Sequence, residues 1–169
     1  VFEPELLKLY ARHYKTGELM PEALVARIRK AGTFNQGFAK TEVLAASYLD
    51  MDWHTLTTSE PQDATAFETA AMAKRGLIKE ILPRYRTTYF AHAADEYAAG
   101  YYSYTWSEVL DSDAFQAFKE KGDVFDQATA AAFRQLLAKG GSEDPALLYR
   151  RFRGRDPKVD ALLDKRGLR

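Results

Sequence analysis

Signals that start and end helices recur along this 169-residue chain, and they constrain its fold more than any other feature. An acidic residue followed by proline opens several candidate helices, and glycine closes several others. Proline is tolerated in the first turn of a helix, a preceding carboxylate can cap that turn, and glycine readily adopts the conformation that ends a helix. Because apolar residues between these signals keep helical spacing, we expect an all-α fold.

The predicted helices cover most of the chain. Their expected bounds are 4 to about 17, 21–32, 38–57, 64–75, about 97–121 and 126–139, with two shorter helices starting at Asp144-Pro145 and Asp156-Pro157. Residues 77–86 lose helical regularity and contain Pro83, so we expect a connector or a short strand there. The sequence shows no repeat and no convincing linker, so we interpret residues 1–169 as a single helical unit.

Composition limits the classes of function. Equal numbers of basic and acidic residues, 24 of each, do not indicate a nucleic-acid partner. No apolar run approaches the roughly 20 residues that cross a bilayer, so no membrane partner is expected. The absence of cysteine fits a reducing compartment and also many exported bacterial proteins. We favour the cytoplasm for a bacterial parent and leave the periplasm open, because the start at Val1 indicates a cropped chain.

One segment concentrates side chains that can both stack and donate hydrogen bonds. Residues 97–106 contain four tyrosines and a tryptophan, and His92 lies just upstream. On a helix, Tyr97, Tyr101 and Tyr104 would fall within an arc of roughly 60°. This spacing predicts that three phenol hydroxyls line one cleft.

The rest of the same predicted helix has two faces. Glu108 and Asp111 continue the tyrosine stripe and would place carboxylates beside the phenols. Tyr102, Trp106 and Val109 lie on the opposite face, where the composition favours packing on the protein interior.

The sequence lacks the local motifs of several enzyme classes. Zinc peptidases usually carry two histidines and a glutamate as H-E-x-x-H on one helix, whereas His13, His54 and His92 are far apart in this chain. The chain also has no glycine-rich phosphate loop and no G-x-S-x-G element. We therefore predict that this chain alone holds no metal ion and is inactive. We expect His54, next to Trp53, to be a structural histidine.

Short segments along the chain carry a resemblance to a known family. They include, in order, Phe34-Asn35-Gln36-Gly37-Phe38, Leu49-Asp50-Met51-Asp52-Trp53-His54, Pro83-Arg84-Tyr85-Arg86, Tyr89-Phe90-Ala91-His92, the tyrosine segment from Tyr97 to Tyr104, and Gly140-Gly141-Ser142-Glu143-Asp144-Pro145. In this order they resemble the C-terminal part of the zinc oligopeptidases related to thimet oligopeptidase, oligopeptidase A and peptidyl-dipeptidase.

The resemblance implies the fold and the setting of the chain. The fold would be the multi-helix C-terminal portion of a neurolysin-like zinc peptidase catalytic domain. In that family the H-E-x-x-H helix and a further glutamate ligand lie N-terminal to the region resembled here. Zinc is therefore expected in the full-length parent and not in this chain alone. The implied partners are short peptide substrates and the remaining N-terminal part of the same peptidase.

The resemblance also implies roles for four residues. Tyr104 and Tyr101 would be catalytic, donating hydrogen bonds to the oxyanion that forms during peptide hydrolysis, and His92 and Tyr97 would bind the substrate. Tyrosine is protonated at neutral pH because its ordinary pKa is about 10. Family members usually have Gly-Gly where this chain has Asp95-Glu96. Because two carboxylates lack the conformational freedom of glycine, we expect loop closure or substrate preference to differ.

A second function class remains open from the sequence. The chain could be a non-catalytic all-helical domain whose tyrosine face binds a peptide or a partner protein. An H-E-x-x-H motif encoded upstream of Val1 would favour the peptidase. Nothing in the residues distinguishes endopeptidase from dipeptidyl carboxypeptidase activity.

Overall fold

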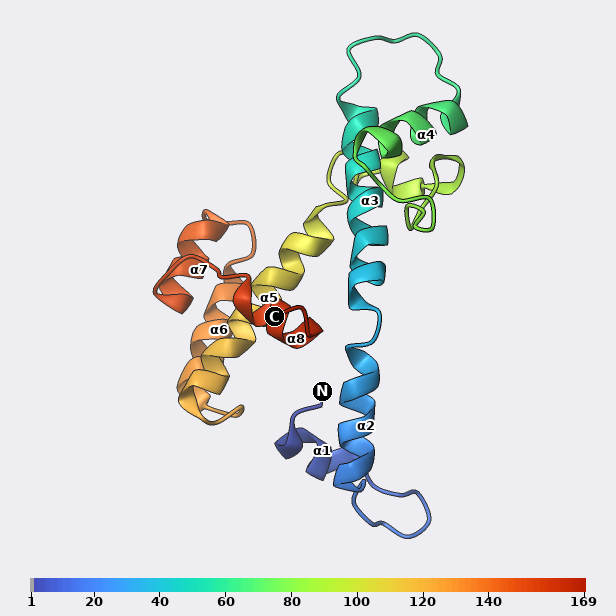
Figure 1. Ribbon diagram of the computed structural model, residues 1–169. Helices are drawn as coiled ribbons and strands as arrows, with labels where there is room; N and C mark the ends of the chain where they lie inside the picture. Colours follow the sequence, from blue (N-terminus) through green and yellow to red (C-terminus); the bar gives the residue numbers. More distant parts are fainter. Residues whose placement is uncertain (1) are drawn as a thin grey trace. The chain divides into compact units, whose positions relative to one another are not determined.

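The computed structural model describes residues 2–169 as helices joined by loops (Figure 1). The helices are α1 (Pro4–Tyr10), α2 (Glu22–Gly32), α3 (Gln36–His54), α4 (Ala64–Lys74), α5 (Ser103–Lys121), α6 (Gln127–Lys139), α7 (Pro145–Arg153) and α8 (Asp160–Arg166), with 3₁₀ turns η1 (Thr87–Tyr89) and η2 (Ala91–Ala94). From residue 2 onward the only strand-like pairing is an isolated bridge between Arg12 and Leu19. The all-α prediction is confirmed, and residues 77–86 form a connector.

Acidic caps explain why three helices begin where the sequence predicts. The carboxylate of Asp63 accepts a hydrogen bond from the first turn of α4, Asp126 does so for α6, and Asp144 for α7. Each such cap is typically worth about 1 kcal/mol, because it satisfies backbone N–H groups that have no partner inside the helix.

The predicted end of α1 and the predicted start of α8 are wrong for identifiable reasons. α1 ends at Tyr10 instead of near Gly17, because the chain turns back there and His13 N–H donates to the carbonyl of Glu18 at 2.8 Å. α8 begins at Asp160 and not at Asp156-Pro157, since the Asp156 carboxylate forms an ion pair with Arg150.

The contacts of the described chain fall into two compact units. Residues 2–34 and Leu110–Arg169 form the terminal unit, and Asn35–Val109 form the pocket unit. α5 begins in the pocket unit and continues in the terminal unit. The expectation of one helical unit over residues 1–169 stays a prediction. None of the helices from residue 2 onward combines the length and apolarity that a bilayer crossing requires.

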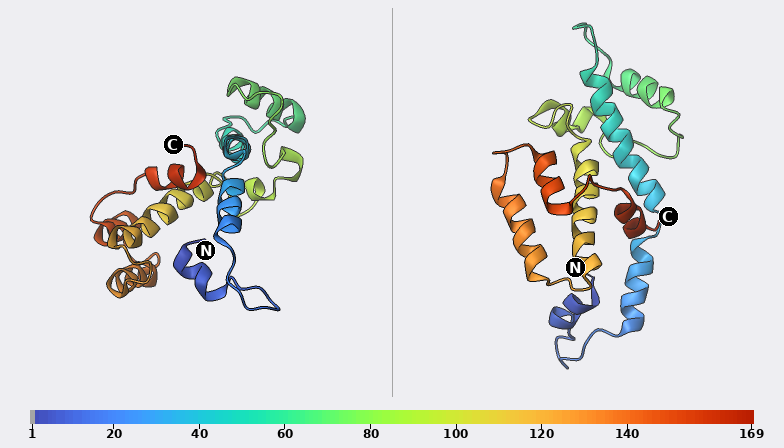
Figure 2. Two further views of the ribbon diagram at one scale, coloured as in Figure 1. Left: turned by 60° about the horizontal axis from the view of Figure 1, so that its bottom comes forward. Right: turned by 90° about the vertical axis from the view of Figure 1, so that its left-hand side faces the viewer.

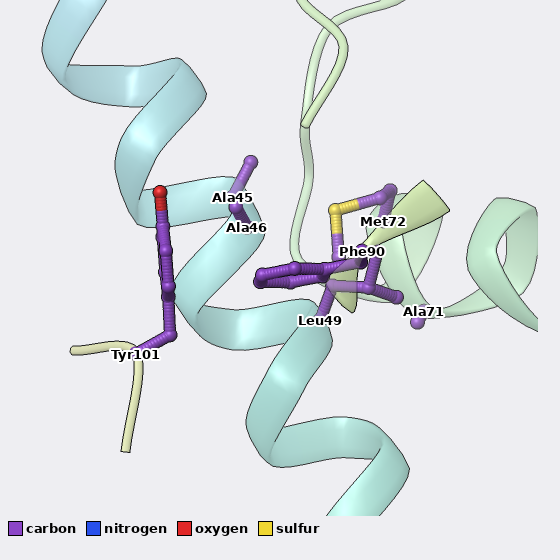
Figure 3. Packing of buried hydrophobic residues seen from close by; sticks show 7 residues of the cluster. All are labelled: Ala45, Ala46, Leu49, Ala71, Met72, Phe90 and Tyr101. Carbon is purple, nitrogen blue, oxygen red and sulfur yellow. The ribbon is translucent and has the colours of Figure 1, made fainter. Parts of the chain in front are cut away.

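The core of the pocket unit forms where α4 lies along the C-terminal part of α3 (Figure 1). Figure 3 shows the Phe90 ring reaching towards α3, with Tyr101 on one side and Met72 on the other. Leu49 of α3 is fully buried beneath this ring. Burying a side chain of this size contributes about 1.5–3 kcal/mol, so this cluster fixes the segments on both sides of the pocket described below.

The connector before Phe90 is held to both helices by polar contacts. Glu68 of α4 is buried and accepts hydrogen bonds from Arg86 Nε and from the backbone N–H of Thr87, the latter at 2.8 Å. Trp53 of α3 donates from Nε1 to Thr87 Oγ1 at 3.1 Å and packs its ring on Phe67. A buried carboxylate without hydrogen-bond partners is energetically costly. The need to satisfy Glu68 therefore favours the backbone conformation in which Arg86 and Thr87 reach it.

In the terminal unit, α5, α6 and α7 lie together (Figure 2). A buried ion cluster connects α5 to α7. Asp113 of α5 is almost fully buried and accepts hydrogen bonds from Tyr149, Arg153 and Arg155 at 2.6, 3.1 and 2.7 Å. Burial alone would raise the pKa of Asp113, but the hydrogen bonds from Arg155, Arg153 and Tyr149 outweigh it and lower the pKa to about 2.

Candidate functional site

A pocket of about 460 Å³ opens in the pocket unit. Its lining combines apolar walls with groups that can donate hydrogen bonds, and comprises Val43, Arg84, Tyr85, His92, Tyr101, Tyr104 and Glu108. We call this the aromatic pocket. α3, the connector, η2, the turn before α5 and α5 itself contribute these residues, so the pocket exists only after distant stretches of chain have packed together.

Three of the four site residues named from the sequence line this pocket, and the fourth, Tyr97, contacts two of them. His92 Nε2 lies 3.2 Å from the hydroxyl of Tyr104, and its ring centroid is 5.6 Å from that of Tyr101. Tyr97 stacks on Tyr104 at 5.8 Å and lies 5.1 Å from His92. Tyr97 therefore sits at the edge of the pocket, in contact with two of the lining residues.

The reason given for this convergence, a shared helical stripe, is wrong. α5 begins at Ser103, so Tyr97 and Tyr101 lie in turns that precede the helix. Tyr101 is 5% exposed and packs edge-on against Phe90 at 5.0 Å, which adds it to the core as well as to the pocket. Tertiary contacts, and not helical periodicity, bring the tyrosines together.

The predicted faces of α5 also require correction. Tyr102 and Trp106 do not pack on the interior, being 55% and 51% exposed, whereas Val109 is buried as expected. Glu108 lines the pocket, but Asp111 does not, because its carboxylate pairs with Lys165 at 3.2 Å.

Both pocket tyrosines are protonated at neutral pH. Burial raises the pKa of Tyr101, with a further increase from Tyr85, against a lowering by the positive charge of Arg84. Burial likewise raises the pKa of Tyr104, and its hydrogen bond with Tyr97 adds to the increase. Both hydroxyls are therefore available as neutral hydrogen-bond donors.

The two charged residues of the pocket differ in their partners. Glu108 is neutralised by Lys40, whose Nζ lies 2.6 Å from the carboxylate and also donates to Thr105 at 3.1 Å. Within the part of the chain that the structure describes, the Arg84 side chain makes no hydrogen bond or ion pair. Arg84 is thus the cation of the pocket that can face a ligand, and no pattern in the sequence predicted this role.

The loop before Tyr97 follows a path that needs no glycine at Asp95 or Glu96. Asp95 forms a tight turn in which its carboxylate accepts from the N–H of Tyr97 at 2.9 Å. The left-handed conformation that glycine favours occurs in this region at Ala99, with φ of 59°. The expected difference in loop closure or substrate preference stays a prediction.

No metal-ligand set is present in residues 2–169: no group of three histidine, aspartate or glutamate side chains could hold an ion. His92 and Glu108 line the aromatic pocket, but zinc needs at least three such ligands. These residues therefore do not fit a zinc site, and the prediction that the chain alone holds no zinc stays untested.

A second hollow in the pocket unit, of about 360 Å³, has a different character. Its walls are mostly apolar and include Leu44, Met72 and Ile78. Its charged residue, Arg75, is already paired with Asp52 at 2.6 Å. The aromatic pocket, with its convergent neutral donors, is the better candidate for chemistry.

Comparison with known proteins gives a consistent result. The sequence profile of Peptidase family M3 matches residues 1–168, which is nearly the whole chain. The chain belongs to peptidase family M3. This membership confirms the resemblance noted from the sequence, and peptidases of this family are generally zinc-dependent.

Individual relatives show how much of a family member the chain represents. It is 42% identical to the dipeptidyl carboxypeptidase of Escherichia coli (strain K12), over 98% of this chain and 25% of that protein. It is 36% identical to oligopeptidase A of the same organism, again over 25% of the relative, and 30% identical to saccharolysin of Saccharomyces cerevisiae, over 23%. The chain therefore spans about a quarter of the length of these curated relatives.

Proposed function

We propose that this chain forms the substrate-side wall of the active site of a zinc-dependent oligopeptidase or peptidyl-dipeptidase that hydrolyses short peptides. The observation that carries the proposal is the convergence of His92, Tyr97, Tyr101 and Tyr104 at one pocket in a chain of family M3. The names of the relatives, dipeptidyl carboxypeptidase and oligopeptidase A, support peptides as the substrate class.

In this proposal the two pocket tyrosines stabilise charge. Attack on a peptide carbonyl group places negative charge on its oxygen, and a neutral donor facing that oxygen lowers the barrier. Tyr104, which is 43% exposed, presents the main donor, and Tyr101 adds a second from the pocket wall. A single donor of this kind is worth about 2.7–4 kcal/mol in transition-state stabilisation.

His92 and Tyr97 hold the substrate and orient Tyr104. We assign the Nε2 proton of His92 to the contact with the Tyr104 oxygen, so that the phenol proton of Tyr104, which is shared with Tyr97 in this structure, can turn to a substrate oxygen. Tyr97 stacks on the other tyrosine and limits the positions of its ring. Together they keep the Tyr104 hydroxyl aimed into the pocket before the reaction begins.

The zinc ion belongs, in this proposal, to the preceding part of the full-length parent. When bound, zinc supplies Lewis-acid catalysis. The described residues of this chain lack its ligand set, so their role is to bind the peptide and donate hydrogen bonds. The chain alone is expected to be inactive.

The alternative, a non-catalytic helical domain that binds a peptide or protein, is less favoured. It explains the exposed aromatic side chains equally well, but it gives no reason for the family match over residues 1–168.

The experiment that tests the proposal replaces Tyr104 by phenylalanine in the full-length parent. Tyr104→Phe removes the hydroxyl and keeps the ring, so kcat should fall by roughly 10²–10³-fold with little change in KM. Steady-state kinetics with a short fluorogenic peptide measure both constants.

Tyr102→Phe is the matched control. Tyr102 is two residues away, is 55% exposed and does not line the pocket, so its hydroxyl should be dispensable for turnover. Equal losses of kcat in the two variants would show that Tyr104 has no special role and would remove the basis of the proposal.

A further inference from the structure

Asp50, in the middle of α3, is a buried carboxylate next to the aromatic pocket but outside its lining. Its side chain is 0% exposed, and it is among the largest fully buried side chains of the described protein. A charged group in such a place must be hydrogen-bonded, because an unpaired buried charge is strongly unfavourable. The groups that donate hydrogen bonds to Asp50 therefore indicate its structural role.

Both oxygens of Asp50 accept hydrogen bonds from the loop that precedes α5. Oδ1 accepts from the backbone N–H of Ala99 at 3.1 Å, and Oδ2 accepts from the backbone N–H of Tyr101 at 3.0 Å. One carboxylate thus holds the two peptide groups on either side of Gly100. Hydrogen bonds to a charged acceptor are about twice as strong as those between neutral groups.

The loop needs such a restraint because its backbone is in an unfavourable conformation. Ala99 has φ of 59°, in the left-handed region that costs an L-residue roughly 1–2 kcal/mol. At Gly100 a side chain would be crowded, since a Cβ there would lie 3.1 Å from the carbonyl oxygen of Tyr97. Conformations of this kind persist only when surrounding contacts enforce them.

His54 supports the carboxylate from the next turn of α3. Its Nδ1 lies 2.7 Å from the carbonyl oxygen of Asp50 and 3.0 Å from Oδ1 of the same residue. Both neighbours are acceptors, so Nδ1 carries a proton and donates. This contact restricts the rotation of the Asp50 side chain.

The restraint reaches the pocket through Tyr101. Its backbone N–H is fixed by Asp50, and its ring lies 5.2 Å from that of Tyr104 and 5.6 Å from that of His92. The chain then enters α5 at Ser103, which sets where Tyr104 emerges. Without the carboxylate, the loop could relax, and both phenols would move.

We infer that Asp50, supported by His54, is a positioning residue that fixes the 99–101 loop and thereby places Tyr101 and Tyr104 in the aromatic pocket. The inference rests on the proposed function, because it assigns these phenols a role in the reaction. Asp50 itself does not line the pocket, and it acts through the backbone of the loop.

The test uses Asp50→Asn in the full-length parent, read by two methods. The amide can accept only one of the two loop N–H groups, so hydrogen exchange at Ala99 and Tyr101 should accelerate by about tenfold or more. As Tyr104 loses its position, kcat should fall roughly 10–100-fold with KM within about threefold. Asp52→Asn is the control on the same helix, because Asp52 pairs with Arg75 outside the pocket, and it should change neither readout.

A double variant tests whether Asp50 affects turnover through Tyr104. If Asp50 acts through Tyr104, then Asp50→Asn combined with Tyr104→Phe should lose little more kcat than Tyr104→Phe alone. Losses that multiply would overturn the inference, as would unchanged hydrogen exchange in Asp50→Asn. If Tyr104→Phe leaves kcat unchanged, the proposed function fails, and the exchange rates alone then decide whether Asp50 holds the loop.

His54→Ala covers the case in which Asp50→Asn does not fold. The His54 side chain is 30% exposed, so its removal should be tolerated while the carboxylate loses its support. Faster exchange at the same two amides and a fall in kcat of about threefold to tenfold are expected. Wild-type values for both would overturn the inference.

Discussion

Ala99 is the residue whose backbone most directly shapes the aromatic pocket. Its left-handed conformation ends the turn that follows Tyr97 and prevents the α-helix from extending back beyond Ser103. Alanine is a poor choice for this conformation, because its Cβ crowds the following carbonyl group. The cost is offset by the hydrogen bond from Ala99 N–H to Asp50, so the loop is held by a tertiary contact against its local preference.

Ala99→Gly should therefore stabilise the full-length protein by up to about 1 kcal/mol, because glycine adopts positive φ without a steric penalty. Ala98→Gly is the matched control. Ala98 is not in the left-handed region, and there the added freedom of glycine should destabilise by about 0.5–1 kcal/mol. Denaturant unfolding of the two variants measures both effects, and a lower stability for Ala99→Gly would contradict the strain described here.

At the scale of elements, α5 and α7 are joined by the buried cluster around Asp113. Arg153 is nearly as buried as the carboxylate and also contacts Glu120, at 2.9 Å. Burial by itself would raise the pKa of Asp113. The hydrogen bonds from Arg155, Arg153 and Tyr149 outweigh this effect and lower the pKa to about 2, below its ordinary value of 3.8. A lowered pKa means that the folded state favours the charged form, so this carboxylate stabilises the fold above pH 4 or so.

Asp113→Asn should destabilise the protein by roughly 3 kcal/mol at neutral pH, because two arginines lose the charge that compensates them. The difference in stability between wild type and variant should shrink as the pH falls from about 4 towards 2. Over this range the wild-type carboxylate becomes protonated and no longer stabilises the fold through its charge. Urea unfolding at neutral pH and at about pH 3 measures this difference.

Asp111→Asn on the same helix is the comparison for this experiment. Asp111 forms an exposed ion pair with Lys165, and such pairs contribute about 1 kcal/mol or less. If Asp113→Asn were as mild as Asp111→Asn, or if its effect grew at low pH, the buried cluster would not have the role described.

The helices themselves were largely predictable from the sequence, because their ends depend on neighbouring residues. Asp63, Asp126 and Asp144 cap the helices that follow them, as such residues do in most proteins. The start of α5 could not be predicted this way. Helical spacing continues back to Tyr97, but Ala99 N–H is bound by Asp50, which lies 49 residues earlier in the chain. No local pattern reports such a contact.

The candidate site was predictable in part for the same reason. His92 and the tyrosines cluster in the sequence, and the resemblance named them directly. Arg84 and Asp50 come from other segments, and their roles depend on how α3 and the connector fold over the start of α5. Long-range contacts determine which polar residues reach a pocket, and these were missed.

At the scale of the whole molecule, the chain accounts for about a quarter of its relatives of family M3. Its described residues provide neutral donors, an unpaired arginine and a restrained loop, but no metal-ligand set. The proposed function uses both, so the pocket and the zinc are expected to come together only in the full-length parent. The proposal is therefore tested most directly by asking whether Tyr104 stabilises the negative charge on the reacting carbonyl oxygen.

The most direct measurement is the inhibition constant of a phosphinic peptide, whose tetrahedral anionic group mimics the charged oxygen. Such an analogue binds through interactions made in the transition state. In the full-length parent, Tyr104→Phe should weaken the inhibitor by roughly 10²-fold or more, whereas Tyr102→Phe should change it by less than about twofold. Undiminished binding to the Tyr104→Phe variant would contradict the role assigned to the aromatic pocket.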